Sequence, residues 1–403
     1  MMAGRNFMMN KINNNLTKEK NLKQLNMGFA FLFLLAGSLQ QFITVHFGMI
    51  GKPELGFKLL LTLYLSVFIT NIFVHKIIGT IGEKRSIVLS SICYLCAGFA
   101  SCQQAEFLLY TSFGIMGFGC ALIWNAQNSV FLDNSASESL GKNAGTFNMY
   151  LWSGCFAGIV LFGLALKAYS FEYVVFVFTC LASISLLYFI KITDSFLPSK
   201  KVDKLSDIVK QRRYIIAAIV SAKSYFLYGL AISFIPFITS QTYENTLYVA
   251  VVSLVFFMAQ AFCSKPCGTL VDRYGTSKLL FAGAITSLLG FILLIFSLHW
   301  IILVLSAFFL GLSSAMLIPV TMLLPKVIAP QKEQAAVVRL LMFGKYTGII
   351  VAITLSTWGS IHDVLIVSII ASCLFLFVSK ALCVSHIKRE SYHKTDLVSE
   401  SNS

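Results

Sequence analysis

Two lysines, Lys223 and Lys345, lie in the interior of long apolar stretches and are the side chains best placed to do chemistry. A cation at the centre of a bilayer costs about 2.5–3.5 kcal/mol on insertion scales, so it normally faces a cavity or a partner. None of the 17 acidic residues lies in the middle of an apolar stretch. Without a carboxylate partner, the two lysines favour binding of an anionic ligand. The structural alternative is a long side chain that reaches the membrane surface.

Amide and aromatic side chains form a second group of candidates, because they recur at helical spacing within the apolar stretches. An amide in lipid must find a hydrogen-bond partner. Hydrogen bonds between helices and the lining of a solute path therefore both remain open for these residues. Besides the two lysines, the candidates for a solute cavity are Gln40, Gln41, Asn71, Trp124, Gln127, Asn128, Asn148 and Tyr228.

No catalytic or metal-binding constellation is present in the sequence. The Gly-x-x-x-x-Gly-Lys-Ser/Thr loop that cradles nucleotide phosphates is missing, which argues against ATP-driven work by this chain alone. The histidines are dispersed without the spacing of metal ligands, and Cys93-x-x-Cys96 lies in an apolar stretch, where packing is the simpler interpretation. We therefore expect no enzyme activity, no catalytic residue, no metal and no cofactor.

The elements that must position these side chains are twelve apolar stretches. Hydrophobic residues make up 57% of the chain and charged residues only 12%, whereas a soluble domain carries about 25% charged residues. About 20 apolar residues in a helix cross a bilayer, and the continuous runs favour helices over a barrel. The predicted fold is an all-α integral membrane protein with spans at 27–49, 57–79, 86–104, 106–132, 144–168, 171–192, 214–240, 246–266, 277–297, 299–324, 335–358 and 361–383.

The distribution of charge gives the topology. The net charge is +14, and an N-terminus inside the cell would place 26 of the 31 Lys and Arg residues at the cytoplasmic face. This asymmetry follows the positive-inside rule and makes a nucleic-acid partner unnecessary. We expect a multi-pass protein of the cell (inner) membrane, with the lipid bilayer as its partner and both termini in the cytoplasm.

The spans divide six and six around a basic polar segment. The predicted parts are a cytoplasmic tail (1–26), an N-terminal six-helix bundle (27–192), a linker (193–213), a C-terminal six-helix bundle (214–383) and a second tail (384–403). Such an arrangement indicates two pseudo-symmetric bundles around a cavity near the middle of the membrane.

A loop motif recurs at equivalent places in the two halves. After the eighth span it comprises Gly268, Asp272, Arg273, Gly275 and Lys278. This loop resembles the signature loop of the major facilitator superfamily. The resemblance implies a latch in which the Asp, beside a helix N-terminus and a neighbouring Arg, holds the cytoplasmic side closed. The loop after the second span departs from the pattern, with Gly79 at the position of the Asp.

A narrower resemblance covers residues 27–165. It rests on Gly28-Phe-Ala-Phe, Ser38-Leu-Gln40-Gln41 and Gly117-Phe-Gly119-Cys-Ala-Leu-Ile-Trp124-Asn125-Ala-Gln127. This segment is similar to the ion-channel-regulator ("uncoordinated"-type) branch of the superfamily. The resemblance implies that a protein partner is one possibility for this chain. The sequence lacks the Gly-Pro signature of drug antiporters in its fifth span, where Gly154-x-x-x-Gly158 indicates close helix packing.

Three functions follow from the residues and the resemblance. The first is secondary-active transport of a small organic solute by alternating access, with a lean towards anions. The second is a non-transporting regulator or chaperone of a channel or receptor. The third is efflux of amphipathic compounds of the multidrug type.

Overall fold

The computed structural model describes residues 2–103, 105–193, 208–235, 239, 246–296, 299–358 and 362–377. Within these ranges the regular structure is helical, and the prediction of an all-α fold is confirmed. Most of the predicted linker (193–213) and all of the predicted C-terminal tail (384–403) lie outside the described residues.

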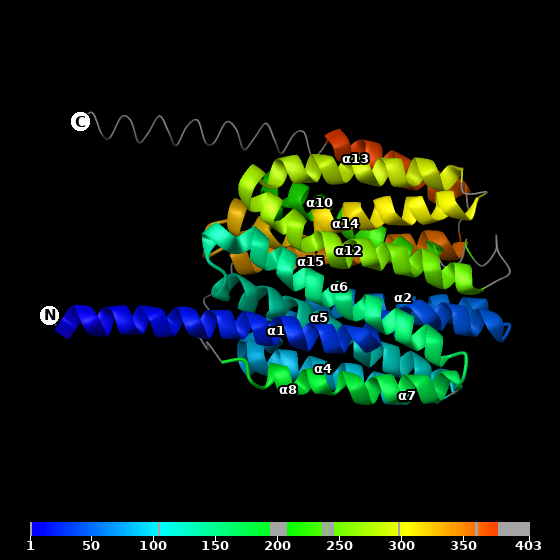
Figure 1. Cartoon of the computed structure of the whole chain (residues 1–403), viewed down its shortest axis with the longest axis horizontal. Helices are drawn as coiled ribbons and strands as arrows, with labels where there is room; N and C mark the ends of the chain where they lie inside the picture. The colour runs from blue at the N-terminus through cyan, green and yellow to red at the C-terminus, as the bar shows by residue number, and fades with distance from the viewer. Residues whose placement is uncertain are drawn as a thin grey trace.

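The first half of the chain supplies six crossings, two of which are interrupted. Its helices are α1 (Met2–Met49), α2 (Pro53–Asn71), α3 (Val74–Ile81), α4 (Glu83–Ala100), α5 (Glu106–Asn134), η1 (Ser137–Ser139), α6 (Leu140–Ala165), α7 (Phe171–Ala182) and α8 (Ile184–Phe189). The pair α2 and α3 forms one predicted span, as does the pair α7 and α8. The helix α1 begins at Met2, so the segment predicted as a polar tail continues the first span as helix (Figure 1).

The second half supplies the remaining crossings. Its helices are α10 (Arg212–Ile232), α12 (Thr246–Tyr274), α13 (Thr276–Ile295), α14 (Trp300–Ile328), α15 (Gln334–Trp358) and a final helix, His362–Phe377. Ten helices in the described chain are long and apolar enough to cross a membrane. Together with α4, which begins with Glu83, Lys84 and Arg85, and the shorter His362–Phe377, they match the twelve predicted spans.

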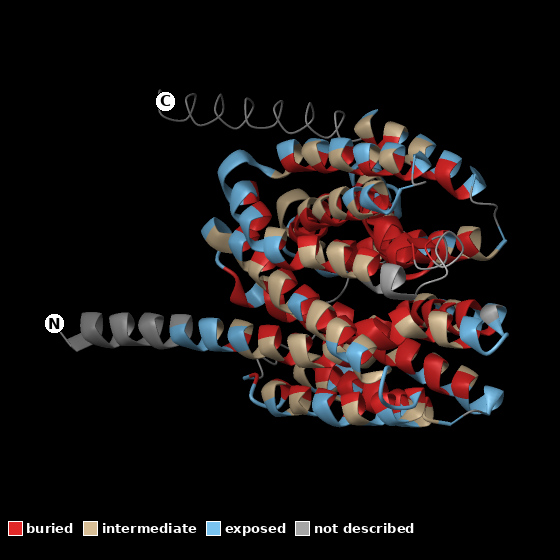
Figure 2. Ribbon diagram, turned by 45° about the vertical axis from the view of Figure 1, so that its right-hand side comes forward, coloured by how far each residue is buried: buried red, intermediate tan, exposed pale blue. Residues whose placement is uncertain are grey.

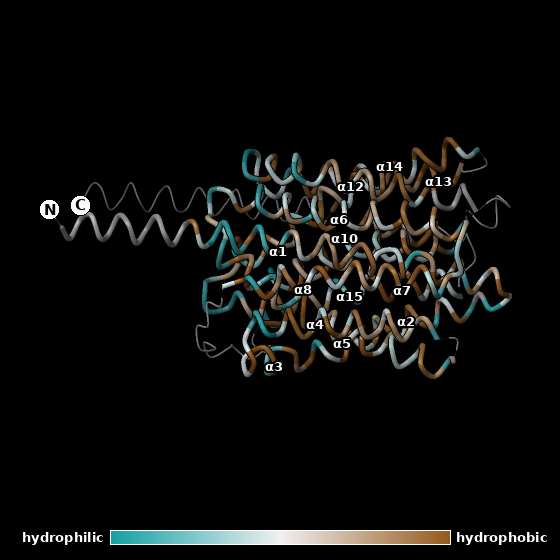
Figure 3. Tube along the Cα trace, turned by 60° about the horizontal axis from the view of Figure 1, so that its bottom comes forward, coloured by the Kyte–Doolittle hydropathy of each residue, from teal (hydrophilic) through white to brown (hydrophobic). Residues whose placement is uncertain are grey.

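The helices run side by side as one bundle, with the helices of the second half above those of the first in Figure 1. Apolar residues line the middle of the bundle and polar residues gather at its ends (Figure 3). Buried residues face inward on each helix (Figure 2). This arrangement leaves apolar side chains such as Phe107 and Phe262 exposed on the outside, as a lipid-facing surface requires.

Small residues bring the helices of each half into backbone contact. A methyl group at Gly154 or Gly158 of α6 would overlap backbone oxygens of α1, and one at Gly344 or Gly348 of α15 would overlap backbone oxygens of α10. The interpretation of Gly154-x-x-x-Gly158 as a packing site is confirmed. The same spacing at equivalent helices of the two halves indicates that the bundles are built alike.

The two halves meet along α6 with α12 and along α2 with α15. At the first contact, Gly141 and Gly145 of α6 lie against the backbone of α12 around Gly268. The turns after the equivalent spans also match. Gly82 has φ +87° and Gly275 has φ +86°, a conformation that side-chain-bearing residues rarely adopt. The glycines of the repeated loop motif therefore have the same structural role in both halves.

Candidate functional site

A central cavity lies between the two halves, and eight of its twelve lining residues are aromatic. The lining residues are Phe33, Gln40, Tyr64, Tyr94, Cys120, Trp124, Trp152, Tyr225, Tyr228, Lys345, Tyr346 and Ile349. They come from α1, α2, α4, α5 and α6 of the first half and from α10 and α15 of the second. Lys345 is the only charged residue among them.

The ammonium of Lys345 is held by aromatic ring faces. Its Nζ lies 3.2 Å from the ring centroid of Trp124, 4.3 Å from that of Tyr225 and 5.5 Å from that of Tyr346. The side chain is 2% exposed, and Nζ has no hydrogen-bond acceptor within the described part of the chain. Cation–π attraction is therefore the interaction that compensates its burial, and it is strongest over Trp.

Gln40 joins both halves at the same cavity. Its Oε1 accepts a 2.6 Å hydrogen bond from the Tyr64 hydroxyl of α2 and a 3.2 Å bond from the Tyr228 hydroxyl of α10. An amide oxygen with two phenol donors is a satisfied group. The neighbouring Gln41 instead donates 2.7 Å to Ser253 Oγ and ties α1 to α12.

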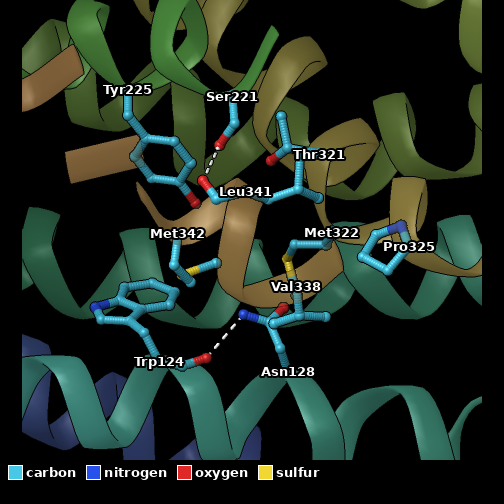
Figure 4. Close-up of a pocket in the computed structure, with 10 residues that line it drawn as sticks. All are labelled: Trp124, Asn128, Ser221, Tyr225, Thr321, Met322, Pro325, Val338, Leu341 and Met342. Carbon is cyan, nitrogen blue, oxygen red and sulfur yellow. Dashed lines mark hydrogen bonds between the residues drawn. The ribbon is translucent and has the colours of Figure 1, made fainter. Parts of the chain in front are cut away.

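A second cavity, drawn in Figure 4, shares two lining residues with the first. It is lined by Trp124, Asn128, Ser221, Tyr225, Thr321, Met322, Pro325, Val338, Leu341 and Met342. Its polar side chains already have backbone partners, since Asn128 donates to Trp124 O (2.7 Å) and Ser221 donates to Leu341 O (2.9 Å). Trp124 and Tyr225 line both cavities.

Lys223 lies apart from both cavities. Its side chain is 6% exposed, and Nζ lies 5.1 Å from the Phe291 ring centroid on α13 and 5.9 Å from that of Phe226. Nζ has no hydrogen-bond partner among the residues that the structure describes. The structure thus brings only one of the two predicted lysines to the central cavity.

The remaining candidate amides lie mostly at helix contacts. Asn71 accepts a 2.9 Å bond from Asn125 and donates 3.3 Å to the carbonyl of Arg339. Asn148 donates to Ala144 O (2.9 Å) and to Met322 Sδ (3.2 Å). Gln127 is fully buried and lines neither cavity. Among these amides, only Gln40 and Asn128 line a cavity.

The predicted latch loop makes a direct contact between the halves. One carboxylate oxygen of Asp272 accepts a 2.7 Å bond from the Gly141 N–H, and the other accepts a 2.7 Å bond from the Lys142 N–H. These are unpaired donors in the first turn of α6, where the helix dipole also favours an anion. Arg273 and Lys278 lie over the Tyr274 ring, at 5.2 and 5.7 Å from its centroid. We call this end of the bundle the latch end.

A second contact at the latch end was missed by the sequence analysis. Arg339 of α15 is 6% exposed, and its Nη1 lies 2.8 Å from Nδ1 of His75 in α3. His75 lies one helical turn before Gly79, the position at which the first half lacks the Asp of the loop motif. The only signal in the sequence was Gly79 at the Asp position, because a half without this Asp needs another contact to close the latch end. Tyr94, Cys120 and Tyr346 were also missed as cavity residues.

Comparison with known proteins gives the same architecture. The profile described as the Major Facilitator Superfamily matches residues 25–251 and 217–401. The crystal structure of the human organic anion transporter MFSD10 (TETRAN) superposes with a TM-score of 0.70 at 12% identity, covering 90% of this chain and 98% of that chain. At this identity the likeness shows the fold alone.

Curated relatives match only part of the chain. Protein unc-93 homolog A of Bos taurus is 29% identical over 111 residues, and that of Mus musculus is 30% identical over 126 residues. UNC93-like protein MFSD11 of Xenopus tropicalis is 26% identical over 130 residues. These matches span 27–32% of this chain and about a quarter of the length of each relative, at 24%, 27% and 29%.

Proposed function

The chain belongs to the Major Facilitator Superfamily, and from that premise we propose that it is a secondary transporter of a small organic anion. The observation that carries the proposal is the central cavity with Lys345 as its only charged residue. The cavity lies between two matched halves, which is where transporters built from repeats bind their solutes.

The preference for an anion rests on the surroundings of Lys345. Its ammonium has ring faces but no hydrogen-bond acceptor within the described residues. A carboxylate in the cavity would supply charge-assisted hydrogen bonds, which are roughly twice as strong as neutral ones. The fold likeness to a protein described as an organic anion transporter agrees with this preference.

The transport mechanism that fits this geometry is alternating access. The latch end would face the cytoplasm, with both chain termini on the same side, because the basic residues gather there. Asp272 would hold this side closed through its two hydrogen bonds to the start of α6. The solute would leave or enter on this side of the cell (inner) membrane once that contact opens.

A ligand screen with matched variants tests the proposal. The purified protein is heated with aromatic and aliphatic carboxylates and with their neutral amides. Anions should raise its unfolding temperature, because a ligand that binds only the folded state stabilises it by mass action. The Lys345→Met variant should lose this stabilisation, whereas Lys223→Met should keep it. Equal stabilisation of wild type and Lys345→Met would refute the role of Lys345.

The likeness to the unc-93 relatives supports a second candidate function. The chain would then act as a non-transporting partner of another membrane protein. Reconstitution in liposomes separates the two functions. Solute exchange by the purified protein supports transport, whereas a stoichiometric protein partner together with no exchange of any stabilising ligand supports the second function.

A further inference from the structure

The two cavities follow one another along the bundle and share part of a wall. The central cavity contains Gln40 and Tyr64, whereas the second cavity extends to Pro325 and Val338. Pro325 lies in the last turn of α14 and Val338 near the start of α15, so the second cavity is closer to the latch end. A solute that travels from the central cavity to the latch end must therefore pass the shared wall.

Trp124 and Tyr225 are the residues that line both cavities. Figure 4 shows both rings on the left side of the second cavity, with Met342 between them in this view and Pro325 on the right. Trp124 comes from α5 of the first half and Tyr225 from α10 of the second. One ring from each half therefore borders both cavities.

The ammonium of Lys345 contacts both of these rings. Its Nζ lies 3.2 Å from the Trp124 centroid and 4.3 Å from the Tyr225 centroid, so one ammonium attracts rings that belong to different halves. No described residue offers Nζ a hydrogen-bond acceptor. The cation is therefore free to exchange its ring partners for a stronger one.

We propose that Lys345, Trp124 and Tyr225 form a gate between the central site and a second, transit site, and that an aromatic carboxylate opens it by drawing the ammonium off the rings. The proposal rests on the proposed function. It specifies the substrate class and the step by which substrate binding opens the gate. The class follows from one cation and eight aromatic residues in the cavity lining. One cation suits one negative charge, and the rings suit an aromatic body.

The relative strengths of these interactions explain why an anion would open the gate and a neutral solute would not. A carboxylate attracts an ammonium by charge and by hydrogen bonds, whereas a ring face attracts it only through a quadrupole. A neutral solute of the same shape cannot compete for the ammonium, so it would leave the gate closed. The second cavity has no charged lining residue and its asparagine and serine are already bonded to the backbone. It would pass an anion onward without retaining it.

Tryptophan fluorescence tests the movement of the ammonium without requiring transport. The full chain in detergent is titrated with benzoate and 2-naphthoate, and with benzamide as the neutral control. The carboxylates should change the emission of the wild type, because a cation leaves the Trp124 ring. The change should become smaller in Trp124→Phe, where Trp152 is the remaining indole of the central cavity. It should disappear in Lys345→Met and remain in Trp358→Phe, whose ring is exposed near the end of α15. An equal response to benzamide, a response that survives in Lys345→Met, or no response to either carboxylate would overturn the proposal.

Liposome experiments separate the gate from the binding site. In Trp124→Leu, efflux of benzoate into solute-free buffer should be about tenfold faster than in wild type, as expected when a desolvated cation–π contact is removed. If efflux and stabilisation by benzoate both fall in this variant, Trp124 is only a part of the binding site and the gate is refuted. If the wild type shows the fluorescence change but no exchange, the proposed transport function fails while ligand control of the ring pair stands.

Discussion

Replacing Asp272 by Asn should open the latch end more often. The substitution keeps the shape of the side chain but removes the charge and one of the two acceptors that now bind the Gly141 and Lys142 N–H groups at 2.7 Å. A hydrogen bond to a charged group contributes about 1.5–3 kcal/mol, and a carboxylate at a helix N-terminus adds about 0.3–1 kcal/mol when exposed. Because Asp272 is exposed to water, we take a smaller value, about 1–2 kcal/mol, or a factor of roughly 5–30 in the open-to-closed ratio.

The opening can be measured by labelling a thiol in the second cavity. Ser221 lines this cavity and is 1% exposed, so Ser221→Cys should react slowly with a bulky maleimide while the latch is closed. The rate of labelling at residue 221, followed by mass spectrometry, should rise roughly 5–30-fold when Asp272→Asn is added. Glu138→Gln is the matched control, because Glu138 is an exposed acid in η1 just before α6. Among the described hydrogen bonds, none joins Glu138 to α12. Equal rates with and without Asp272→Asn, or the same rise in Glu138→Gln, would refute the latch.

Three further predictions concern the other polar and glycine contacts. Lys223→Met should raise the unfolding temperature by a few degrees, because it removes a buried amine that has no acceptor among the described residues. Burial of such a group costs about 1–3 kcal/mol. A lower unfolding temperature would contradict this prediction. His75→Glu should pair with Arg339 and slow labelling of the second cavity, whereas Lys76→Glu, on the exposed side of α3, should not. Gly348→Ala should destabilise the protein by about 1–3 kcal/mol in denaturant melts, since its methyl would overlap the α10 backbone; unchanged stability would refute this close contact.

The fold could be predicted from the sequence because a bilayer permits few backbone structures. A helix must satisfy its own backbone in lipid, so the length of each apolar stretch predicts a crossing. It was less informative about interruptions. The breaks between α2 and α3 and between α7 and α8 occur at Ile72–Phe73 and at Ser183, residues that carry no strong turn signal.

For the candidate site, the sequence predicts how deep a residue lies in the membrane but not which way its side chain points. Depth along a span is readable from the sequence, and both lysines were correctly placed in span interiors. Direction around the helix depends on packing. Lys223 precedes Tyr225 by two positions, a spacing that puts the two side chains on different faces of α10. Since Tyr225 lines the cavity, this spacing was the available sign that Lys223 points elsewhere.

Arg339 shows a further difficulty. Its place in the first turns of a predicted span suggested one more basic residue at the membrane surface, whereas the structure buries it against His75 and beneath the Asn71 amide. The contact joins residues 264 positions apart in the chain. No local pattern reports such a pairing, because it exists only after both halves have folded.

The glycine seams within each half have a mechanical consequence. Where α6 meets α1 and where α15 meets α10, backbone touches backbone, and no side chain stands between them that could adopt another rotamer. Each seam therefore resists bending and shear, so a half tilts as a stiff block. Any movement that alternately exposes the middle of the protein must then be concentrated at the contacts between the halves, where α6 meets α12 and α2 meets α15.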